Sequence, residues 1–258
     1  YGDAVPSLTY SVSGSGLVNG DALSGALETS ANASSNTGSY AITQGTLAAS
    51  SNYAMTYVGG TATVTPRPIS VSANNQSIVY GDALPTLTYS VGGSGLVNGD
   101  TLSGVLDTSA AALSSIGDYA VTQGTLAASS NYAMTYVGGT MTVAPRPITV
   151  NANSQSMLYG DAVPALTYTV GGRGLVQGDV LSGALATPAT SFSDVNAYAI
   201  TRGSLAASSN YTLTYVGSTM TITPATLSVT AGSGTMIYGD GLPLLGHIIS
   251  GWKNGQND

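Results

Sequence analysis

The sequence predicts an all-β protein built from tandem modules of 79 residues, each small and sandwich-like, arranged as an elongated array. The triplet Tyr-Gly-Asp begins at residues 1, 80, 159 and 238, so its spacing is 79 residues each time. A fixed period of this kind indicates a repeat array. Short segments within each period alternate hydrophobic and polar residues, which is typical of half-buried strands. Residues that favour turns, chiefly glycine, proline and asparagine, separate these segments.

The period divides the 258 residues into four repeats. Repeats 2 and 3 are complete and span residues 67–145 and 146–224. Repeat 1 (residues 1–66) lacks its first strand, and repeat 4 (residues 225–258) is partial and divergent. We therefore expect a segment of a longer array, in which contacts between neighbouring repeats add to the stability of each module.

Repeat 2 serves as the template for the elements. Residues 66–68 (Pro-Arg-Pro) open it as a linker, because proline lacks the amide hydrogen that a sheet ladder needs. Alternation then predicts about six strands, at residues 69–73, 87–91, 102–106, 118–126, 131–137 and 140–143. Residues 78–80 form a short apolar run that ends at the turn Gly81-Asp82. The last two flank Gly138-Gly139, which predicts a hairpin with a two-residue turn. Asn98-Gly99 predicts a tight turn or a single helical turn.

Two other architectures compete with the sandwich-like module. A β-grasp module would need a helix near residues 96–102, where the sequence has room for barely a single turn. A parallel β-helix would show a period of about 20–30 residues, and no such period occurs within the 79 residues of a repeat.

The positions that we select as structural turn and packing sites recur at the repeat period. In repeat 2 they are Tyr80, Gly81, Asp82, Pro85, Tyr89, Asn98, Gly99, Asp100, Tyr119, Tyr132, Tyr136, Gly138 and Gly139. Each complete repeat has five tyrosines, which suit strands that pack one face and keep the hydroxyl at a wet edge. We interpret Asp82 and Asp100 as turn-capping residues that bond local amides. A calcium site is the alternative, but the sequence lacks the closely spaced carboxylates of such a site.

Composition and charge disfavour several classes of function. Only 7% of residues are charged and the net charge is −7, and the five cations do not cluster. Nucleic acid and anionic membranes are therefore not expected as partners, and no apolar stretch is long enough for insertion into a membrane. The chain has no cysteine, and its one histidine is His247, outside the complete repeats. Because a hydrolytic triad needs a base beside its nucleophile, we expect no catalysis and no cofactor.

Four motifs follow one another in repeat 2. They are Tyr-Gly-Asp-x-x-Pro-x-Leu-Thr-Tyr (80–89), Gly-Leu-Val-Asn-Gly-Asp-x-Leu-Ser-Gly (95–104), Tyr-Ala-Val-Thr-Gln-Gly-Thr-Leu (119–126) and Asn-Tyr-x-x-Thr-Tyr-Val-Gly-Gly-Thr (131–140). In this order they resemble the MBG-type and YDG-type repeats of very large exported bacterial proteins, including filamentous-haemagglutinin-like adhesins of two-partner secretion systems. The resemblance covers residues 1–245.

This resemblance implies a surface-exposed or secreted location and a role in adhesion or matrix building, and it carries no catalytic residues. Two departures stand out. The arginine of the linker is lost at Ala225, and residues 250–255, with Trp252, match residues 94–99 two positions early.

Three functions are consistent with the sequence. The first is a structural stalk or spacer of a bacterial cell-surface adhesin or extracellular fibre, with neighbouring repeats as partners. The second is a module that binds host or matrix glycans, or a host protein, through the variable loops at residues 30–39, 109–117 and 186–196, because specificity often resides in loops. The third is a fibre subunit: repeat 1 lacks an opening strand and residues 225–231 supply one, so strand addition between copies could pair them.

Overall fold

The computed structural model describes residues 1–176 and 178–257, which form β-strands and no helix. The all-β prediction is confirmed, and none of these residues belongs to a helix that could cross a membrane. The chain divides into two compact units. Unit 1 comprises Tyr1–Ile78, Ala83–Ala111 and Gly117–Val143, and unit 2 comprises Val79–Asp82, Ala112–Ile116 and Ala144–Asp258. Residues 177 and 258, in repeats 3 and 4, lie outside the described residues.

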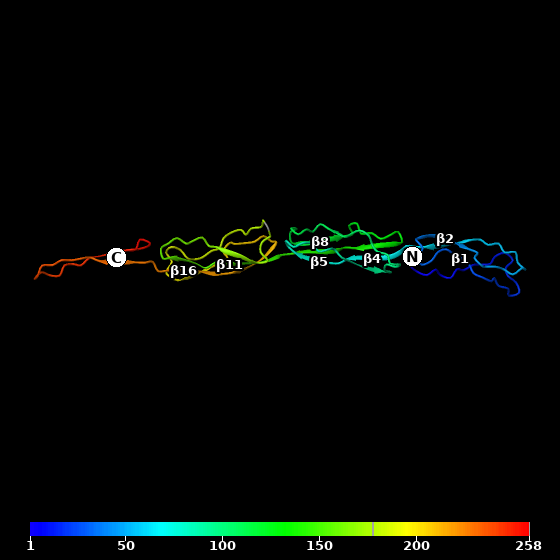
Figure 1. The fold of residues 1–258 in the computed structure, drawn as a ribbon, viewed down its shortest axis with the longest axis horizontal. Coiled ribbons are helices and arrows are strands. Elements are labelled where there is room, and N and C mark those ends of the chain that lie inside the picture. Colours follow the sequence, from blue (N-terminus) through cyan, green and yellow to red (C-terminus); the bar gives the residue numbers. More distant parts are fainter. Residues whose placement is uncertain (177, 258) are drawn as a thin grey trace. The chain divides into compact units, whose positions relative to one another are not determined.

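The first sheet of repeat 2 has a central strand with one antiparallel and one parallel neighbour. Its strand order is β6-β4-β9, with β4 (Arg67–Ala73), β6 (Tyr89–Gly93) and β9 (Tyr132–Val137). The central strand β4 is labelled in Figure 1. Val71 of β4 lies between Val91 of β6 and Tyr136 of β9. Mixed pairs of this kind do not form the parallel rungs of a β-helix, so that architecture is excluded for this repeat.

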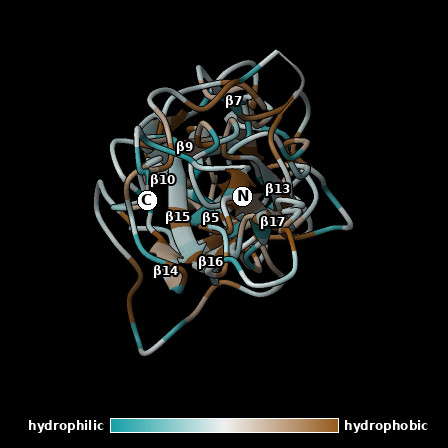
Figure 2. Ribbon diagram, turned by 90° about the vertical axis from the view of Figure 1, so that its left-hand side faces the viewer, coloured by the Kyte–Doolittle hydropathy of each residue, from teal (hydrophilic) through white to brown (hydrophobic). Residues whose placement is uncertain are grey.

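The second sheet of repeat 2 has the strand order β5-β10-β8-β7. Its strands are β5 (Gln76–Val79), β7 (Asp107–Thr108), β8 (Gly117–Thr122) and β10 (Gly139–Ala144). β10 runs antiparallel to β8, and Met141 lies opposite Tyr119. β5, β7 and β10 are labelled in Figure 2, where the ribbon is coloured by hydropathy.

Repeat 3, in unit 2, has two corresponding sheets, but a single bridge between Ala186 and Thr201 stands where repeat 2 has β7. The first has the order β13-β11-β15, with β11 (Arg146–Ala152), β13 (Tyr168–Gly172) and β15 (Tyr211–Val216). The second has the order β12-β16-β14, with β12 (Gln155–Leu158), β14 (Ala197–Ile200) and β16 (Ser218–Thr223). β12 runs parallel to β16 and β11 runs parallel to β15.

Both sheets of repeat 3 supply one core. Its fully buried members include Val150 from the first sheet and Ile200, Met220 and Ile222 from the second. Tyr215 packs against this cluster and donates its hydroxyl to the backbone oxygen of Ile200 at 2.8 Å. Burying each large aliphatic side chain contributes about 1.5–3 kcal/mol. Because the module has few aromatic residues other than tyrosine, these buried aliphatic side chains are its main source of stability.

The predicted hairpin at Gly138-Gly139 is wrong. β9 belongs to the first sheet and β10 to the second, and neither glycine has the positive φ that a two-residue hairpin turn requires. The chain instead continues from one sheet into the other, as it also does from β4 to β5. A Cβ on Gly139 would lie 2.8 Å from the carbonyl oxygen of Ala73. The glycine is therefore needed because two backbone segments approach closely, and not because the chain reverses.

Two further expectations for repeat 2 are settled by the backbone. Asn98 and Gly99 have φ values of 56° and 77°, and the amide of Asp100 donates to the carbonyl of Val97 at 2.9 Å. This is a tight turn without a helix, so the β-grasp alternative lacks its helix in the part of the chain that the structure describes. The strand predicted at residues 102–106 is wrong in position, because only a single bridge at Ser103 occurs there and β7 follows it.

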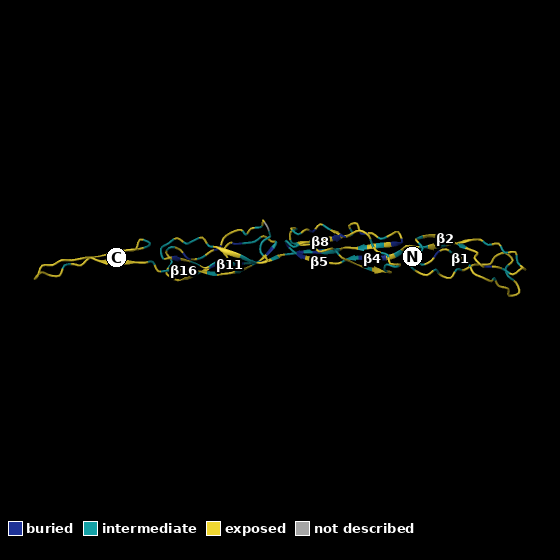
Figure 3. Cartoon of the chain, in the orientation of Figure 1, coloured by how far each residue is buried: buried dark blue, intermediate teal, exposed yellow. Residues whose placement is uncertain are grey.

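Repeats 1 and 4 contain only parts of this pattern. In repeat 1, a sheet of order β1-β2-β3 contains β1 (Glu28–Thr29), β2 (Gly38–Thr43) and β3 (Gly60–Val64). In repeat 4, β17 (Ser228–Ala231) pairs antiparallel with β18 (His247–Ser250). The segment around β17 and β18 is almost wholly exposed (Figure 3, yellow).

Candidate functional site at the joints between repeats

The Tyr-Gly-Asp triplet forms a tip that packs on the following repeat, and we call this contact a joint. In unit 1, the first joint brings Tyr1, Gly2 and Asp3 against the opening strand and the loop at residues 95–97 of repeat 2. In unit 2, the second joint brings residues 80–82 against the matching parts of repeat 3. The joints are the places where the recurring positions of the sequence act on one another.

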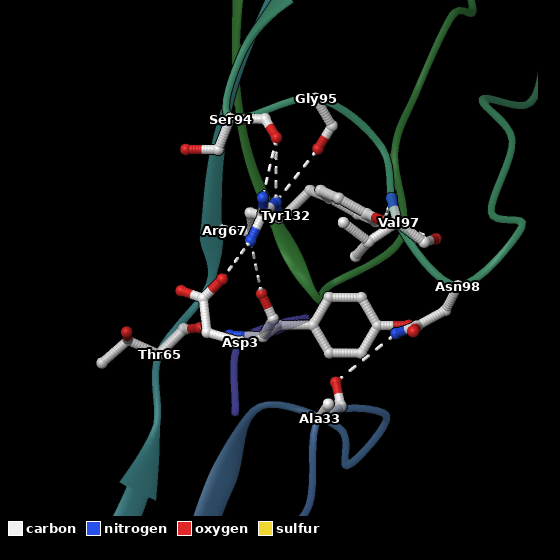
Figure 4. Close-up of polar contacts among 10 residues, drawn as sticks. Asp3, Ala33, Thr65, Arg67, Ser94, Gly95, Val97, Asn98 and Tyr132 are labelled. Atoms are coloured by element: carbon white, nitrogen blue, oxygen red, sulfur yellow. Dashed lines mark hydrogen bonds and ion pairs between the residues drawn. The ribbon is translucent and has the colours of Figure 1, made fainter. Parts of the chain in front are cut away.

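Arg67 connects the tip to the loop in the first joint (Figure 4). Its Nη1 donates to the Tyr1 carbonyl oxygen at 3.2 Å and to the Asp3 carboxylate at 2.8 Å. Its Nε and Nη2 donate to the carbonyl oxygens of Ser94 and Gly95, at distances from 2.8 to 3.2 Å. The Asp3 side chain is 83% exposed, so the ion pair itself contributes little. The bonds from the planar guanidinium to backbone oxygens fix the tip on the loop.

Two tyrosines share one carboxylate in the first joint. The rings of Tyr1 and Tyr132 meet edge to face, with centroids 5.5 Å apart, which is a favourable aromatic geometry. Both hydroxyls donate to Oδ2 of Asp100, at 2.9 and 2.8 Å, and the Tyr132 hydroxyl accepts from the Val97 amide at 3.0 Å. Burial raises the pKa of Tyr132; the Val97 amide opposes this shift and the Asp100 carboxylate adds to it. The Tyr132 hydroxyl therefore stays neutral and continues to donate.

The glycine of the tip is required for two reasons. Gly2 has a φ of 84°, in the region that favours glycine, and a Cβ there would lie 2.5 Å from Cγ2 of Val97. Gly81 has the same φ and meets Val176 in the same way. A valine side chain thus covers the bare backbone of each glycine, and any larger residue at the tip would separate the two surfaces.

A buried asparagine that we did not select from the sequence completes the joint. Asn131 is 9% exposed. Its Oδ1 accepts from the Thr37 amide and its Nδ2 donates to Oδ1 of Asn36, each at 2.9 Å. In the second joint, Oδ1 of Asn210 accepts from the Ile116 amide at 3.1 Å. The recurrence of this asparagine at the repeat period is the signal that could have identified it.

The second joint repeats the arginine contacts and adds one more. Arg146 donates to the Tyr80 carbonyl and to Asp82, both at 3.2 Å, and to the carbonyl oxygens of Arg173 and Gly174 at 2.7 and 2.9 Å. Arg173 stands where repeat 2 has Ser94, and its Nη2 donates to both oxygens of Asp82, at 3.0 and 2.8 Å. Asp82 is therefore held by two guanidinium groups.

The tyrosine pair also recurs in the second joint. The rings of Tyr80 and Tyr211 meet edge to face at 5.6 Å, and the Tyr211 hydroxyl donates to Asp179 and accepts from the Val176 amide. Burial, and next the hydrogen bond to Asp179, raise the pKa of Tyr211. The same neutral, donating hydroxyl thus closes both joints.

The third joint, also in unit 2, uses a lysine in place of the arginine. The position that holds arginine in the other joints is Ala225. Lys253 donates from Nζ to Asp161 at 2.9 Å. The same side chain covers the tip glycine, because a Cβ on Gly160 would lie 2.5 Å from the lysine Cβ. Lys253 therefore takes both the place of the valine and the charge of the arginine.

Strand pairing corrects the alignment of the tail with residues 94–99. β17 and β18 pair Ser228 with Ser250 as β4 and β6 pair Ser70 with Gly92, so Ser250 takes the place of Gly92. The two residues that repeat 4 lacks are the counterparts of the first two in 94–99. Those two supply the carbonyl oxygens that accept from the arginine. The arginine and its acceptors are thus missing together.

Asp82 and Asp100 do not act as the local turn caps that we expected. The carboxylate of Asp82 accepts from Arg146 and Arg173, and that of Asp100 accepts from Tyr1 and Tyr132. The reason is that each side chain meets a stronger donor from another segment than its own turn offers. Within residues 1–176 and 178–257, no three His, Cys, Asp or Glu side chains gather in a way that could hold a metal ion.

The remaining selected positions lie away from the joints. Tyr136 donates its hydroxyl to the backbone oxygen of Val121 at 2.9 Å, which connects the two sheets of repeat 2. Tyr89 is exposed in β6, Tyr119 lies in β8, and Pro85 lies in the segment between β5 and β6.

The variable loops take part in the joints through their backbone. The Ala33 and Ala112 carbonyls accept from the amides of Gly2 and Gly81, the tips of their own repeats, at 2.9 and 2.8 Å. Across the first joint, the Ala33 carbonyl also accepts from the side chain of Asn98 at 3.4 Å. At the same repeat position, the Ser191 carbonyl accepts from the side chain of Asn254 at 2.8 Å. A loop whose side chains vary can serve here because its main chain makes the contact.

Comparison with family models gives three matches to one model, described as MBG domain (YGX type), at residues 1–63, 69–142 and 148–221. No curated protein and no solved structure matches the chain. The three matched stretches follow the repeats, and each contains one Tyr-Gly-Asp tip. Each also contains the loop on which the tip of a preceding repeat packs.

Proposed function

The chain belongs to the MBG domain family of the YGX type, whose domains occur in large bacterial surface proteins, and on this premise we propose that its repeats form the stalk or spacer of a bacterial cell-surface adhesin or extracellular fibre. In this proposal the module has no ligand of its own to convert. Its work is to hold other parts of a surface protein at a distance, and its partners are neighbouring repeats.

The observation that supports a stalk is the reuse of one joint. The tip glycine, the paired tyrosines and the arginine occur at the same repeat positions in the first and second joints. A joint that includes buried polar groups and bonds to backbone oxygens restricts rotation more than a flexible linker would. A chain of such joints is suited to transmit length and load from one repeat to the next.

We also propose that the protein acts without catalysis. Its single histidine, His247, lies in β18 of the divergent repeat, and the complete repeats contain neither histidine nor cysteine. Two of the tyrosines with a raised pKa, Tyr132 and Tyr211, donate to aspartates inside the joints, where they have a structural use. These contacts support a structural role for the two tyrosine hydroxyls, rather than a role in catalysis.

A surface-display experiment tests the stalk. Residues 67–224 would be inserted in increasing numbers of copies between a membrane anchor and a reporter domain. We expect the distance of the reporter from the cell surface to grow in proportion to the number of copies. In a matched control, Gly/Ser spacers of equal residue number should grow only as about the square root of length. Equal behaviour of the two series would contradict a stalk.

A second candidate function, binding of glycans or a host protein, is favoured by one observation. Leu113 and Phe192 occupy the same position in the variable loops of repeats 2 and 3 and are 66% and 72% exposed. Exposed apolar side chains at a repeated site suit a contact surface. If this function exists, the chain should bind on a glycan array or to host matrix proteins, and the double variant Leu113→Ser, Phe192→Ser should lose that binding. An array without signal for the native chain would reject this candidate.

A further inference from the structure

The first and last parts of repeat 3 run side by side over the length of the repeat. We call residues 146–158 (β11 and β12) the leading segment and residues 211–223 (β15 and β16) the trailing segment. β11 pairs in parallel with β15, and β12 pairs in parallel with β16. In both ladders each residue lies opposite the residue 65 positions later, as Arg146 does with Tyr211 and Leu158 with Thr223. One register therefore holds through both sheets.

The pairing of the two segments also covers the point where the chain passes from one sheet to the other. There the hydroxyls of Ser154 and Ser218 share a hydrogen bond of 2.7 Å. Beyond β12, the amide of Tyr159 donates to the carbonyl oxygen of Thr223 at 2.9 Å. The two segments are thus bonded to each other from one end of the repeat to the other.

Both segments supply fully buried side chains to the core. Those of the leading segment are Ile148 and Val150, and those of the trailing segment are Met220 and Ile222. These side chains cover the inner faces of the two ladders and keep water away from them. Hydrogen bonds in such a low-dielectric environment are stronger than bonds surrounded by water.

The direction of the strands decides how tension acts on this pair. Tension along the chain enters repeat 3 at Arg146 and leaves it at Thr223. Because the two segments run in the same direction, these residues lie at opposite ends of the pair. The tension therefore slides the segments along each other, and the evenly spaced bonds of a parallel ladder share the load. An antiparallel pair pulled at its two adjacent ends would instead open one bond at a time.

We infer that the leading and trailing segments form a mechanical clamp, which resists unfolding of the repeat under tension. Residues 159–210, which lie between the two segments in the sequence, carry little of this load. The variable loop at residues 186–196 can therefore change without weakening the clamp. Repeat 2 has the same arrangement, because Arg67–Ser72 pair in parallel with Tyr132–Val137 in the same register. The inference rests on the proposed stalk function, which supplies the tension.

The direction of pulling tests the clamp without altering its ladders. Because the native chain has no cysteine, full chains with two introduced cysteines accept handles at chosen exposed sites. Pro147→Cys with Thr221→Cys pulls along the pair, and Pro147→Cys with Thr212→Cys pulls across it, since Pro147 lies opposite Thr212. We expect a force of unfolding several-fold higher along the pair than across it. Equal forces in the two directions would overturn the inference.

A matched pair of proline variants identifies the ladder that bears the load. Bonds from the amides of Arg146 and Arg173 fix the alternation of the two ladders in the first sheet of repeat 3. The amides of Thr214 in β15 and Thr169 in β13 therefore both point toward β11. Both side chains are exposed, so proline at either position removes a ladder donor without removing a buried side chain.

The proline variants would be stretched as full chains held at their two ends. Each complete repeat has 79 residues, so its unfolding releases roughly 200–250 Å of chain and identifies the steps of repeats 2 and 3. Thr214→Pro should lower the force of one of these two steps, and Thr169→Pro should leave both forces as they are in the native chain. Forced unfolding depends on the unfolding rate, so urea unfolding of both variants controls for their loss of equilibrium stability. Equal loss of force in the two variants would contradict a clamp in the parallel ladder.

Failure of the clamp can be distinguished from failure of the stalk. If the reporter distance grows with copy number but the forces along and across the pair are equal, the repeats are a spacer without a clamp. If the forces differ with direction but the display series behaves like Gly/Ser spacers, the clamp is present and the stalk is rejected.

Discussion

The second and third joints, both in unit 2, hold the Tyr-Gly-Asp tip on the following repeat with different side chains. At the second, Arg146 reaches from the opening strand and bonds a tip carbonyl, a tip carboxylate and two loop carbonyls. At the third, Lys253 reaches from the loop and makes one bond to Asp161. Asp161 and the lysine side chain are 42% and 37% exposed, so solvent screens this pair. The third joint is expected to be the weaker of the two.

The difference shows that the arginine and the loop act as one unit. Repeat 4 lacks the arginine and also the two loop residues whose carbonyl oxygens would accept from it. A guanidinium left without those acceptors would lose hydrogen bonds and keep its desolvation cost. The cation has moved to the loop position that already covers the tip glycine, so one side chain now performs two tasks.

The largest expected effect comes from the tip glycine. Gly81→Ala should lower the free energy of unfolding of unit 2 by about 2–3 kcal/mol, because the new Cβ meets Val176 and the positive φ is strained. Gly239→Ala is the matched control, since a Cβ there meets nothing within 4 Å and only the strain remains. Urea unfolding measures both. Equal losses would show that the glycine is needed for φ alone and that Val176 does not constrain the joint.

The arginine should come next. Arg146→Ala should cost about 1.5–3 kcal/mol, because it removes charge-assisted bonds and leaves backbone acceptors unpaired. Arg146→Lys should recover only a small part, since a lysine cannot span the tip and the loop together. Lys253→Ala at the third joint should cost about 0–1 kcal/mol. Thermal unfolding of the three variants measures the order of their stability losses. An Arg146→Lys variant as stable as the native chain would contradict the expected role of the arginine.

The shared tyrosine hydroxyl should have a smaller effect. Tyr211→Phe keeps the ring contact with Tyr80 but removes the donor to Asp179 and the acceptor for the Val176 amide. We expect a loss of about 1–2 kcal/mol. Tyr168→Phe, at a partly exposed tyrosine of β13, is the control and should be close to neutral. Chemical denaturation of both variants provides the comparison.

The smallest expected effect is a dependence on alkaline pH. The folded pKa values of Tyr132 and Tyr211 are raised above the ordinary value. Their contribution to stability is therefore fully present below about pH 10 and is lost as the pH rises through the raised folded values. Unfolding measured across this range should show a decline that is reduced in Tyr211→Phe. A stability that rose with pH in this window would contradict the assigned hydrogen bonds.

Much of the fold could be predicted because its signals are local. Alternation located β4, β9 and β10 closely, and Asn98-Gly99 identified its turn. The hairpin at Gly138-Gly139 was wrong because two glycines between alternating runs also fit a strand that passes from one sheet to another. Only the neighbouring segment at Ala73, distant in sequence, decides between these outcomes.

The joint was less predictable, because its partners are far apart in the chain. Tyr80, Gly81, Asp82 and Asp100 were selected from their recurrence, but recurrence does not state what a residue contacts. Arg67 appeared only as part of a linker, although it bonds residues on both sides of the joint. Correlated change within one chain, as at Ala225 and the shortened loop, is the signal that identifies such a group.

Small-angle X-ray scattering of the full chain tests the central claim most directly. Measurement at low concentration keeps association of copies out of the data. If the joints hold successive repeats in a fixed line, the scattering should show a rod with the cross-section of one module, and Arg146→Ala should make it more flexible. A compact particle, or profiles that do not differ between the two chains, would contradict the account.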